Sequence, residues 1–388
     1  MAWPSDVALS MRTVRMLGAT ALVVSSLVVT VSRVGATPTN LDCATQVVDN
    51  WTLTQIANET IVVPVTAARI GSMGPAARAG YGGLLLFGTT APPTLSPILA
   101  TLQRERPGHF TMMIMTDEEG GGVMRLTNVV SPFPWAQTMG RTATTARIVA
   151  IATRVGTQLA AAGVNTDLAP VLDVDRRADY PGAANPDGLR SFSGVPDVAA
   201  ADGTAFMQGL ARAHVTSVVK HFPGLGYSTR NTDYGPAATL PWSTLQTTGL
   251  VPFRQAIANG ATAVMLSNAR VPGLSALPSS ISPAVITVLR QTLGFQGLIV
   301  TDSLSAGAIS ALHLAEPAAG VRAVAAGADM ILFGSPKSPV ASLALAGQIS
   351  SALVAAVNTA TLPRSTLVAA AAQVLAARNT VACPAPTG

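Results

Sequence analysis

The chain has 388 residues, of which 49% are hydrophobic and only 11% are charged, and it contains 34 Gly and 27 Pro. This composition excludes a disordered protein and supplies ample apolar surface for a packed core, and the length allows one large α/β barrel or two smaller domains. The formal net charge of +5 comes from arginine, because Lys220 and Lys337 are the only lysines. The sequence has no basic run and no interleaving of basic with aromatic residues, so nothing in it indicates a nucleic-acid partner.

Residues 1–36 are predicted to be a signal peptide or an N-terminal anchor. Arg12 and Arg15 precede an apolar segment at residues 17–31, and the small residues at 34–36 offer a cleavage site. The apolar segment is short for a membrane span, and an uncleaved anchor is the alternative. The sequence therefore predicts a secreted or cell-envelope protein, with residues 37–388 as the mature chain.

Two cysteines, Cys43 and Cys383, lie at opposite ends of the mature chain. The termini of compact domains often lie close together, and an exported protein meets an oxidising compartment. We therefore expect a disulfide between them, with two separate buried thiols as the alternative.

Apolar runs alternate with Ala-rich segments of helical spacing along the mature chain. The runs that predict strands lie at residues 60–65, 83–87, 110–117, 164–171, 215–222, 262–267, 298–302 and 328–333. The segments that predict helices lie at residues 44–58, 146–162, 198–213, 245–259, 283–293 and 341–378. Nearly continuous apolar runs are typical of a parallel sheet that is buried on both faces.

Eight such runs, most of them followed by a helix, predict a single-domain α/β fold, a TIM-type (β/α)8 barrel, with the last helical tract outside it. A doubly wound open sheet is the alternative. No Gly-x-Gly-x-x-Gly follows the first run to indicate a dinucleotide cofactor.

Polar residues stand where several of these runs end, which is where barrels carry their active sites. Asp117 and two glutamates precede three glycines, Lys220 and His221 precede a Pro-Gly turn, and Arg190 lies in a long loop after the run at residues 164–171. For the Asp117 stretch, and for Lys220 and His221 alone, a structural role is an equally good explanation, whereas a loop as long as the one that carries Arg190 is usually functional.

Asp302 ends the run at residues 298–302. A buried carboxylate is costly unless it is paired, and opposite Lys220 and Arg190 it would stay ionised, as a nucleophile requires. The alternative is a helix N-cap, because Leu304 begins a helical pattern. Charged residues at separate strand ends, without Cys/His metal spacing, fit a hydroxyl-rich neutral ligand such as a sugar, with no metal and no organic cofactor.

A set of specific motifs extends this interpretation. They are Gly-Gly-Leu-Leu-Leu-Phe-Gly at 82–88, Asp-Glu-Glu-Gly-Gly at 117–121, Leu-Ala-Pro-Val-Leu-Asp-Val at 168–174, Arg-Ser-Phe at 190–192, Lys-His-Phe-Pro-Gly at 220–224, Leu-Gly-Phe-Gln-Gly at 293–297, Thr-Asp at 301–302 and Ala-Gly-Ala-Asp-Met at 326–330. Through them the chain, from about Trp51 to Gly334, resembles the single-domain bacterial β-N-acetylglucosaminidases of glycoside hydrolase family 3.

The resemblance implies a TIM barrel and an exported retaining exo-β-glycosidase, similar to β-N-acetylhexosaminidases, that acts on a terminal sugar such as one of cell-wall glycan. Asp302 would be the nucleophile that forms a glycosyl-enzyme intermediate. The side chains implied to hold the sugar hydroxyls are those of Asp117, Arg125, Arg190, Lys220 and His221.

The chain departs from the family pattern in the loop that carries the acid/base. The family reads His-Gly after Lys-His-Phe-Pro-Gly and then Asp-Ser-His, whose Asp and His transfer the proton. Here the first His is replaced by Leu225, the Asp by Asn231 and the second His by Asp233. A second arginine of the glycine loop is replaced by Gly122, and the usual Ala-His after a later strand is Ser-Asn at 267–268.

Three hypotheses follow from these departures. In the favoured one, Asp233 is the acid/base with a pKa raised as its loop closes over the sugar, and Asn231 hydrogen-bonds its carboxyl or the leaving group. In the second, a catalytically impaired protein binds glycan without cleaving it. In the third, Lys220 forms a Schiff base, as in barrel aldolases. The retained Asp302 favours the first.

Overall fold

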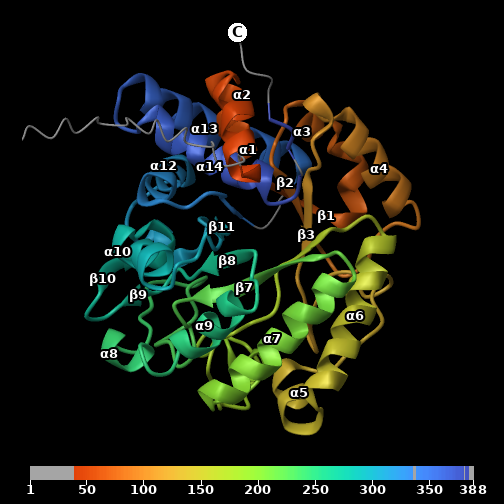
Figure 1. The fold of residues 1–388 in the computed structure, drawn as a ribbon, viewed down its shortest axis with the longest axis vertical. Helices are drawn as coiled ribbons and strands as arrows, with labels where there is room; N and C mark the ends of the chain where they lie inside the picture. The colour runs from red at the N-terminus through yellow and green to blue at the C-terminus, as the bar shows by residue number, and fades with distance from the viewer. Residues whose placement is uncertain (1–38, 335–337, 380, 384–388) are drawn as a thin grey trace, which may run out of the picture. The chain divides into compact units, whose positions relative to one another are not determined.

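The computed structural model describes residues 39–334, 338–379 and 381–383. The predicted signal peptide or anchor at residues 1–36 lies outside these residues. Figure 1 shows the described chain as a curled sheet with helices packed around it.

Seven parallel strands form the main sheet, in the order β1-β2-β3-β6-β7-β8-β11. Their bounds are β1 Val62–Thr66, β2 Gly83–Phe87, β3 Met113–Thr116, β6 Thr166–Asp167, β7 Thr216–Phe222, β8 Ala263–Leu266 and β11 Leu298–Val300. Two antiparallel pairs lie outside it: β4 (Glu118–Gly120) with β5 (Val123–Met124), and β9 (Arg270–Val271) with β10 (Ser275–Pro278). The strand order follows the chain, whereas the strand order of a doubly wound sheet reverses direction, so the doubly wound alternative is wrong.

The eighth predicted run, residues 328–333, forms single parallel bridges rather than a strand. Met330 bridges to Val300, the last residue of β11, and Ile331 bridges to Ile61, just before β1. The predicted α/β class is thus confirmed as a curled parallel sheet with helices on its outside.

Helices follow most strands and cover the outer face of the sheet (Figure 1). Their bounds are α1 Asn40–Asp49, α2 Leu53–Glu59, α3 Gly74–Arg78, α4 Leu95–Glu105, α5 Ala136–Thr142, α6 Thr145–Ala161, α7 Pro196–Arg212, α8 Trp242–Leu245, α9 Leu250–Ala258, α10 Pro283–Thr287, α11 Gly307–Ser310, α12 Glu316–Ala326, α13 Pro339–Asn358 and α14 Arg364–Ala376. The predicted helix at residues 245–259 is present as α9, which begins at Leu250, and the short α8 ends where the predicted helix was expected to start. The C-terminal tract divides into α13 and α14: the backbone leaves the helical conformation at Ala360, whose φ is 57°, and α14 begins after Pro363, its N-cap.

Helices α6 and α7 show why the Ala- and Gly-rich sequence packs well. A Cβ on Gly209 of α7 would lie 2.5 Å from the Cβ of Ala152 of α6. Glycine at this position therefore allows the two helices to approach closely. Helix α13 is long and apolar enough to cross a membrane, yet its buried residues Ile349 and Leu353 belong to the core that α2 and α12 share.

The two ends of the described chain are joined by a disulfide between Cys43 of α1 and Cys383, which confirms that prediction. Their Cα atoms lie 4.4 Å apart although the residues are 340 positions apart in sequence. The Asn40 side chain accepts a hydrogen bond from the Val381 N–H at 2.7 Å, which ties the same two segments together.

A buried ion cluster lies at the N-terminal side of the strands. Glu59, just before β1, pairs with Arg106 and with Arg378, the latter at 2.5 Å. Arg378 also donates to the Gly82 carbonyl before β2. Burial raises the pKa of Glu59 even though both guanidinium groups lower it. This cluster connects the C-terminal segment to the base of the sheet.

Candidate active site

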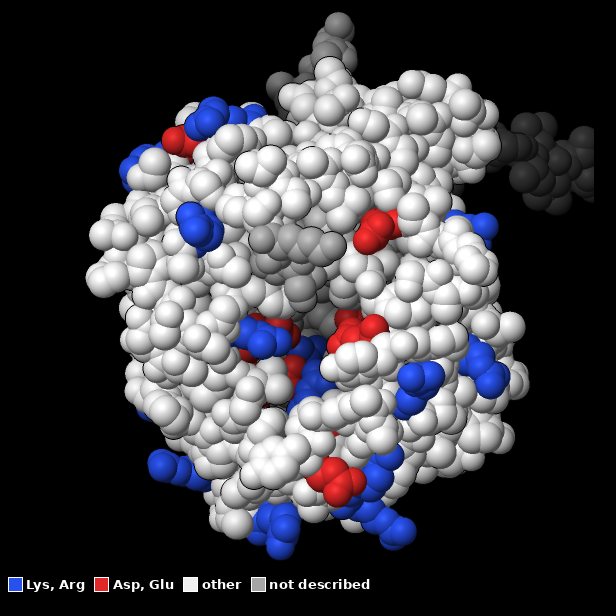
Figure 2. Space-filling model, turned by 180° about the vertical axis from the view of Figure 1, so that it is seen from behind, with Lys and Arg blue, Asp and Glu red and all other residues white. Residues whose placement is uncertain are grey.

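A cavity of about 370 Å³ opens at the C-terminal ends of the strands. Figure 2 shows it as a hollow in which basic and acidic side chains gather. All eight residues that the sequence analysis assigned to catalysis or sugar binding line it: Asp117, Arg125, Arg190, Lys220, His221, Asn231, Asp233 and Asp302.

The parallel sheet explains why residues so far apart in sequence meet here. Asp117 directly follows β3, Lys220 and His221 lie near the end of β7, and Asp302 comes two residues after β11. Because the carboxyl ends of parallel strands share one edge, each strand delivers its last polar residues to the same place.

Lys220 lies at the centre of a buried charge cluster. Its Nζ is 2.7 Å from Asp117 Oδ1 and 2.6 Å from Glu119 Oε1. Burial lowers the pKa of Lys220, but the two carboxylates outweigh burial and raise it overall. A Schiff-base lysine must lose its proton, so this environment argues against the aldolase hypothesis.

Glu119 is a residue that the sequence analysis missed. It also accepts two hydrogen bonds from Arg190, at 2.7 Å from Nε and 2.9 Å from Nη2. Burial raises the pKa of Glu119, but the charges of Arg190 and Lys220 outweigh it and hold the pKa well below its usual range. The sequence signal was present in the two glutamates after Asp117, but only the register of β4 decides which of them faces the cavity.

The other glutamate, Glu118, faces away and shapes the loop. Its Oε1 accepts from the backbone N–H groups of Arg125 and Leu126, at 3.0 and 2.8 Å. The loop thereby places the Arg125 side chain at the cavity, with Nε 3.8 Å from Asp117 Oδ2 and the guanidinium over the Phe87 ring.

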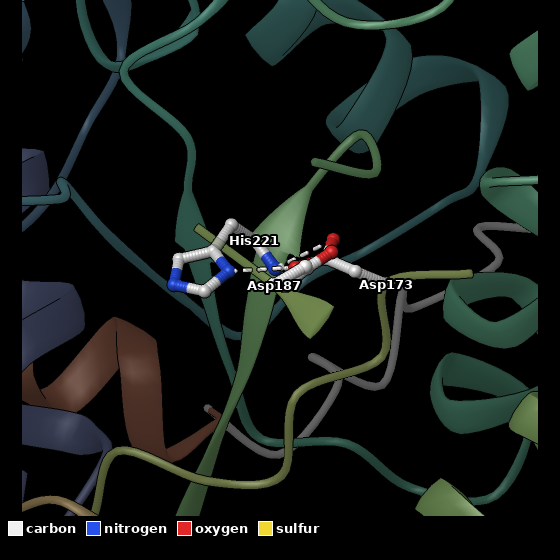
Figure 3. A group of neighbouring side chains, drawn as sticks. All are labelled: Asp173, Asp187 and His221. Atoms are coloured by element: carbon white, nitrogen blue, oxygen red, sulfur yellow. Dashed lines mark hydrogen bonds and ion pairs between the residues drawn. The ribbon is translucent and has the colours of Figure 1, made fainter. Parts of the chain in front are cut away.

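The carboxylate of Asp173 fixes the imidazole ring of His221. The imidazole Nδ1 lies 2.7 Å from Asp173 Oδ2 (Figure 3). Burial, and after it the charge of Arg190, lower the pKa of His221 to about 4, so the ring is neutral at neutral pH. Its Nε2 is 3.4 Å from Arg190 Nη2.

Asp302 does not pair with the cations that the sequence analysis placed opposite it. Among the described residues, Lys220 and Arg190 form their ion pairs with Asp117 and Glu119 instead. Asp302 Oδ1 accepts from the Ser303 N–H at 2.7 Å, and burial raises the pKa of Asp302. Asp302 shares the cavity with both cations but forms no ion pair with them, because two nearer carboxylates reach both cations; the charge of Lys220 still lowers the pKa of Asp302.

The N-cap alternative for Asp302 is wrong. The next helix, α11, begins at Gly307 and has Ala306 as its N-cap, and Leu304 lies in a turn before it. The Asp302 side chain is left to face the cavity.

Asp233 lies on an exposed loop that is anchored to the start of α11. The Gly307 N–H donates to the Asp233 carbonyl at 3.0 Å, and the Ala308 N–H donates to the Thr232 carbonyl at 2.9 Å. The Asn231 side chain accepts from the Asp233 N–H at 2.9 Å. Asn231 thus fixes the backbone of Asp233, whereas the sequence analysis expected a hydrogen bond to its carboxyl or to the leaving group.

Comparison with known proteins was made on sequence and on structure. Residues 77–377 match the family described as "Glycosyl hydrolase family 3 N terminal domain". The chain is 33% identical over 243 residues to "Beta-hexosaminidase LpqI" of Mycobacterium tuberculosis, covering 61% of this chain and 62% of that protein. It is 34% identical over 283 residues to an "Uncharacterized secreted glycosyl hydrolase" of Arthroderma benhamiae, covering 70% of this chain and 78% of that protein.

Solved structures give the same result. A glycosyl hydrolase of this family from Mycobacterium smegmatis matches with a TM-score of 0.75 at 28% identity, covering 86% of this chain and 98% of that one. A Beta-N-acetylhexosaminidase from Beutenbergia cavernae matches with a TM-score of 0.75 at 29% identity, covering 85% and 99%. With a family match over more than half of its length, the chain belongs to glycosyl hydrolase family 3.

Proposed function

We propose that the protein is a retaining exo-β-glycosidase that hydrolyses the bond to a terminal β-linked sugar, and that this sugar is a β-N-acetylhexosamine. The observation that carries the proposal is the position of Asp302 in the same cavity as the buried cluster of Lys220, Asp117, Glu119 and Arg190. Membership of family 3 and relatives named beta-hexosaminidases support it.

In the proposed site, Asp117, Arg125, Arg190, Lys220 and His221 hold the sugar hydroxyls. Carboxylates accept from hydroxyl groups, whereas ammonium and guanidinium groups donate to them. The ion pairs among these side chains fix them before substrate arrives, so little conformational freedom is lost on binding. The Asn231 side chain accepts a hydrogen bond from the backbone N–H of Asp233 and so fixes the backbone of Asp233.

The reaction proceeds in two displacements. The Asp302 carboxylate attacks the anomeric carbon while the bond to the leaving-group oxygen breaks and Asp233 donates a proton to that oxygen. Water then attacks the anomeric carbon of the glycosyl ester, Asp233 accepts its proton, and Asp302 is released as a carboxylate. Both inversions together retain the β configuration.

Two further proposals concern the closure of the barrel and the export of the protein. We propose a closed eight-stranded barrel, supported by the bridges of Met330 and Ile331 to the two ends of the sheet. We further propose residues 1–36 as a signal peptide or anchor and residues 37–388 as one secreted or envelope-associated domain, supported by the secreted fungal relative. Cell-wall glycan or its fragments would then be the accessible substrate.

A panel of nitrophenyl and dinitrophenyl β-glycosides tests the proposed function on the wild type, Asp302→Ala, Asp233→Ala and a control. Asp302→Ala is expected to lose turnover with every substrate, and azide should restore it and yield the α-glycosyl azide. Asp233→Ala should lose about 10²–10⁴-fold with nitrophenyl substrates but far less with dinitrophenyl ones, whose leaving group needs no proton. The exposed Asp197 of α7 supplies the control Asp197→Ala, which should match the wild type.

Two outcomes contradict the proposal. Turnover that survives in Asp302→Ala removes the nucleophile from its role. Wild-type protein that binds N-acetylglucosamine but cleaves no substrate of the panel is the catalytically impaired glycan-binding protein.

A further inference from the structure

His221 lines the cavity and also belongs to a buried group with Asp173 and Asp187, which do not line it. One ligand atom of each residue lies within 4.8 Å of the others, and all three side chains are buried (Figure 3). Asp173 follows β6, Asp187 lies in the long loop before Arg190, and His221 comes from β7. Neither aspartate lines the cavity, so the proposed reaction leaves both unexplained.

Asp173 is fully occupied as a hydrogen-bond acceptor. Its Oδ1 accepts from the backbone N–H groups of His221 and Leu225, at 3.2 and 2.6 Å. Its Oδ2 faces His221 Nδ1 at 2.7 Å. A carboxylate that accepts N–H donors on both oxygens is ionised, so the His221 proton must sit on Nδ1.

Asp187 has no such donors. It is fully buried, and neither of its carboxylate oxygens receives a hydrogen bond from the described residues. One carboxylate oxygen of Asp187 nevertheless lies within 4.8 Å of ligand atoms of both Asp173 and His221. Two buried carboxyl groups this close are costly to ionise together, and Asp173 is the acceptor for its other neighbours. The carboxyl that holds a proton is therefore that of Asp187.

The charges around Asp187 agree with this assignment. Burial and the negative charge of Asp173 raise the pKa of Asp187 well above its ordinary value, as does the charge of Asp175. Arg190 acts in the opposite direction without reversing it. Burial raises the pKa of Asp173 too, to about 6, but there the backbone N–H groups of Leu225 and His221 oppose it, whereas Asp187 has no such donors.

We propose that Asp187 is a positioning residue: its neutral carboxyl donates a hydrogen bond to Asp173, and Asp173 holds His221 as the neutral Nδ1–H tautomer. His221 Nε2 then carries no hydrogen and is an acceptor: Arg190 Nη2 lies 3.4 Å from it in this structure, and a hydroxyl of the bound sugar would replace that long contact. The inference rests on the proposed sugar-binding role of His221. It makes the site selective for a free hydroxyl at that position, because an O-methyl or deoxy sugar has no hydrogen to donate to Nε2.

A metal ion is the competing explanation for a His and two Asp. Tetrahedral ligands about 2.1 Å from a zinc ion would lie roughly 3.4 Å from one another. His221 Nδ1 and Asp173 Oδ2 are closer than that, at 2.7 Å, and Asp173 already accepts two backbone N–H groups. The nearby Arg190 guanidinium also disfavours a second cation. The geometry fits a proton better than a metal.

The test uses the full chain with ¹⁵N-labelled histidine and the variants Asp187→Asn, Asp187→Ala and Asp173→Asn. The chain has four histidines, and His221→Ala identifies the signal of interest. Wild type and Asp187→Asn, whose amide still donates, should show the neutral Nδ1–H tautomer and kcat/KM values within about threefold. In Asp173→Asn the amide can donate to Nδ1, so the Nε2–H tautomer should appear and kcat/KM should fall about 10²-fold.

Infrared spectroscopy reports on the proton itself. The difference spectrum of wild type minus Asp187→Asn at neutral pH should contain the carbonyl band of a protonated carboxylic acid, which needs no turnover and does not depend on Asp187→Ala folding. Where Asp187→Ala folds, it should lose the single tautomer and about 10-fold in kcat/KM.

The inference is overturned by an Nε2–H or doubly protonated His221 in the wild type, by absence of the carboxylic acid band, or by Asp187→Asn losing as much activity as Asp187→Ala. A stoichiometric divalent metal that survives EDTA also overturns it. A wild type with the predicted tautomer and band but no glycosidase activity would contradict the proposed function and leave the proton assignment standing.

Discussion

Asp302 and Asp233 line the same cavity, and the negative charge of Asp233 acts on Asp302 in the same direction as burial. Burial is the larger effect, and both raise the pKa of Asp302, while the Ser303 N–H and the charge of Lys220 lower it without reversing the shift. The charge of the proposed acid/base therefore opposes the ionisation of the proposed nucleophile, and this electrostatic coupling has a consequence for the pH profile.

This coupling predicts an acid limb of activity that shifts when Asp233 is neutralised. Asp302 must be ionised to attack, so its raised pKa makes activity fall, on acidification, at a higher pH than an ordinary aspartate would. Asp233→Asn removes the charge that raises this pKa, and the midpoint of the limb should move to lower pH. The measurement is kcat/KM against pH with a dinitrophenyl glycoside, which needs no acid help. An unchanged or higher midpoint contradicts the coupling.

Gly307 is predicted to set the position of the Asp233 loop. A Cβ at Gly307 would lie 2.7 Å from the Asp233 carbonyl oxygen and 2.7 Å from the Gly235 nitrogen. Gly307→Ala should displace the loop and lower kcat/KM for nitrophenyl substrates on the order of 10–10²-fold, with little effect on dinitrophenyl substrates. Gly347 of α13 has no atom within 4 Å of such a Cβ, so Gly347→Ala is the matched control and should keep wild-type rates. Equal rates in both variants would show that the loop position is unimportant.

Glu119 is predicted to be essential for the sugar-binding cluster. Glu119→Gln leaves Arg190 and Lys220 buried with one counter-charge fewer, which should destabilise the protein by about 3–5 kcal/mol and lower kcat/KM. Glu105, which pairs with Arg78 at the surface, gives the control: Glu105→Gln should cost less than about 1 kcal/mol. Urea unfolding measures both, and a Glu119→Gln protein as stable as the control would contradict the assigned role of the cluster.

The buried carboxyl of Glu118 should make the free energy of unfolding depend on pH. Burial raises the pKa of Glu118 from an ordinary 4.5 to about 7, although the N–H groups of Leu126 and Arg125 lower it. The folded state therefore prefers protonated Glu118, and its contribution to stability is complete below pH 4.5 and is lost as the pH rises through 7. Glu118→Gln, which stays neutral, should gain up to about 3 kcal/mol over the wild type between pH 4.5 and 8. A pH-independent difference in the free energy of unfolding would rule this out.

Removing the disulfide between Cys43 and Cys383 should lower the stability of the protein without lowering its catalytic rate. Cys43→Ser opens a covalent loop of 340 residues, and the free energy of unfolding should fall by about 2–4 kcal/mol. Neither cysteine lines the cavity, so kcat/KM at 25 °C should stay at the wild-type value. A large fall in kcat/KM in the folded variant would show an unexpected connection between the chain ends and the site.

The sequence by itself determined most of the residues that reach the site, Glu119 being an exception. Apolar runs long enough to be buried strands carry Lys220, His221 and Asp302 near their ends, and parallel strands bring those ends to one edge. Hydrophobic periodicity, and the glycine and proline residues that end each run, are local features, so they can be recognised in a single sequence. For the same reason the helical tracts were located but their breaks, such as the one before Pro363, were not.

Only the tertiary structure decided which charged side chains of the site pair with one another. Lys220 pairs with Asp117 and Glu119, which are about a hundred positions away in sequence, rather than with Asp302, and Asp187 lies beneath His221 without any local signal for it. Electrostatic pairing depends on distances of a few ångström between segments that strand order and sheet curvature bring together. Local sequence patterns do not encode those distances.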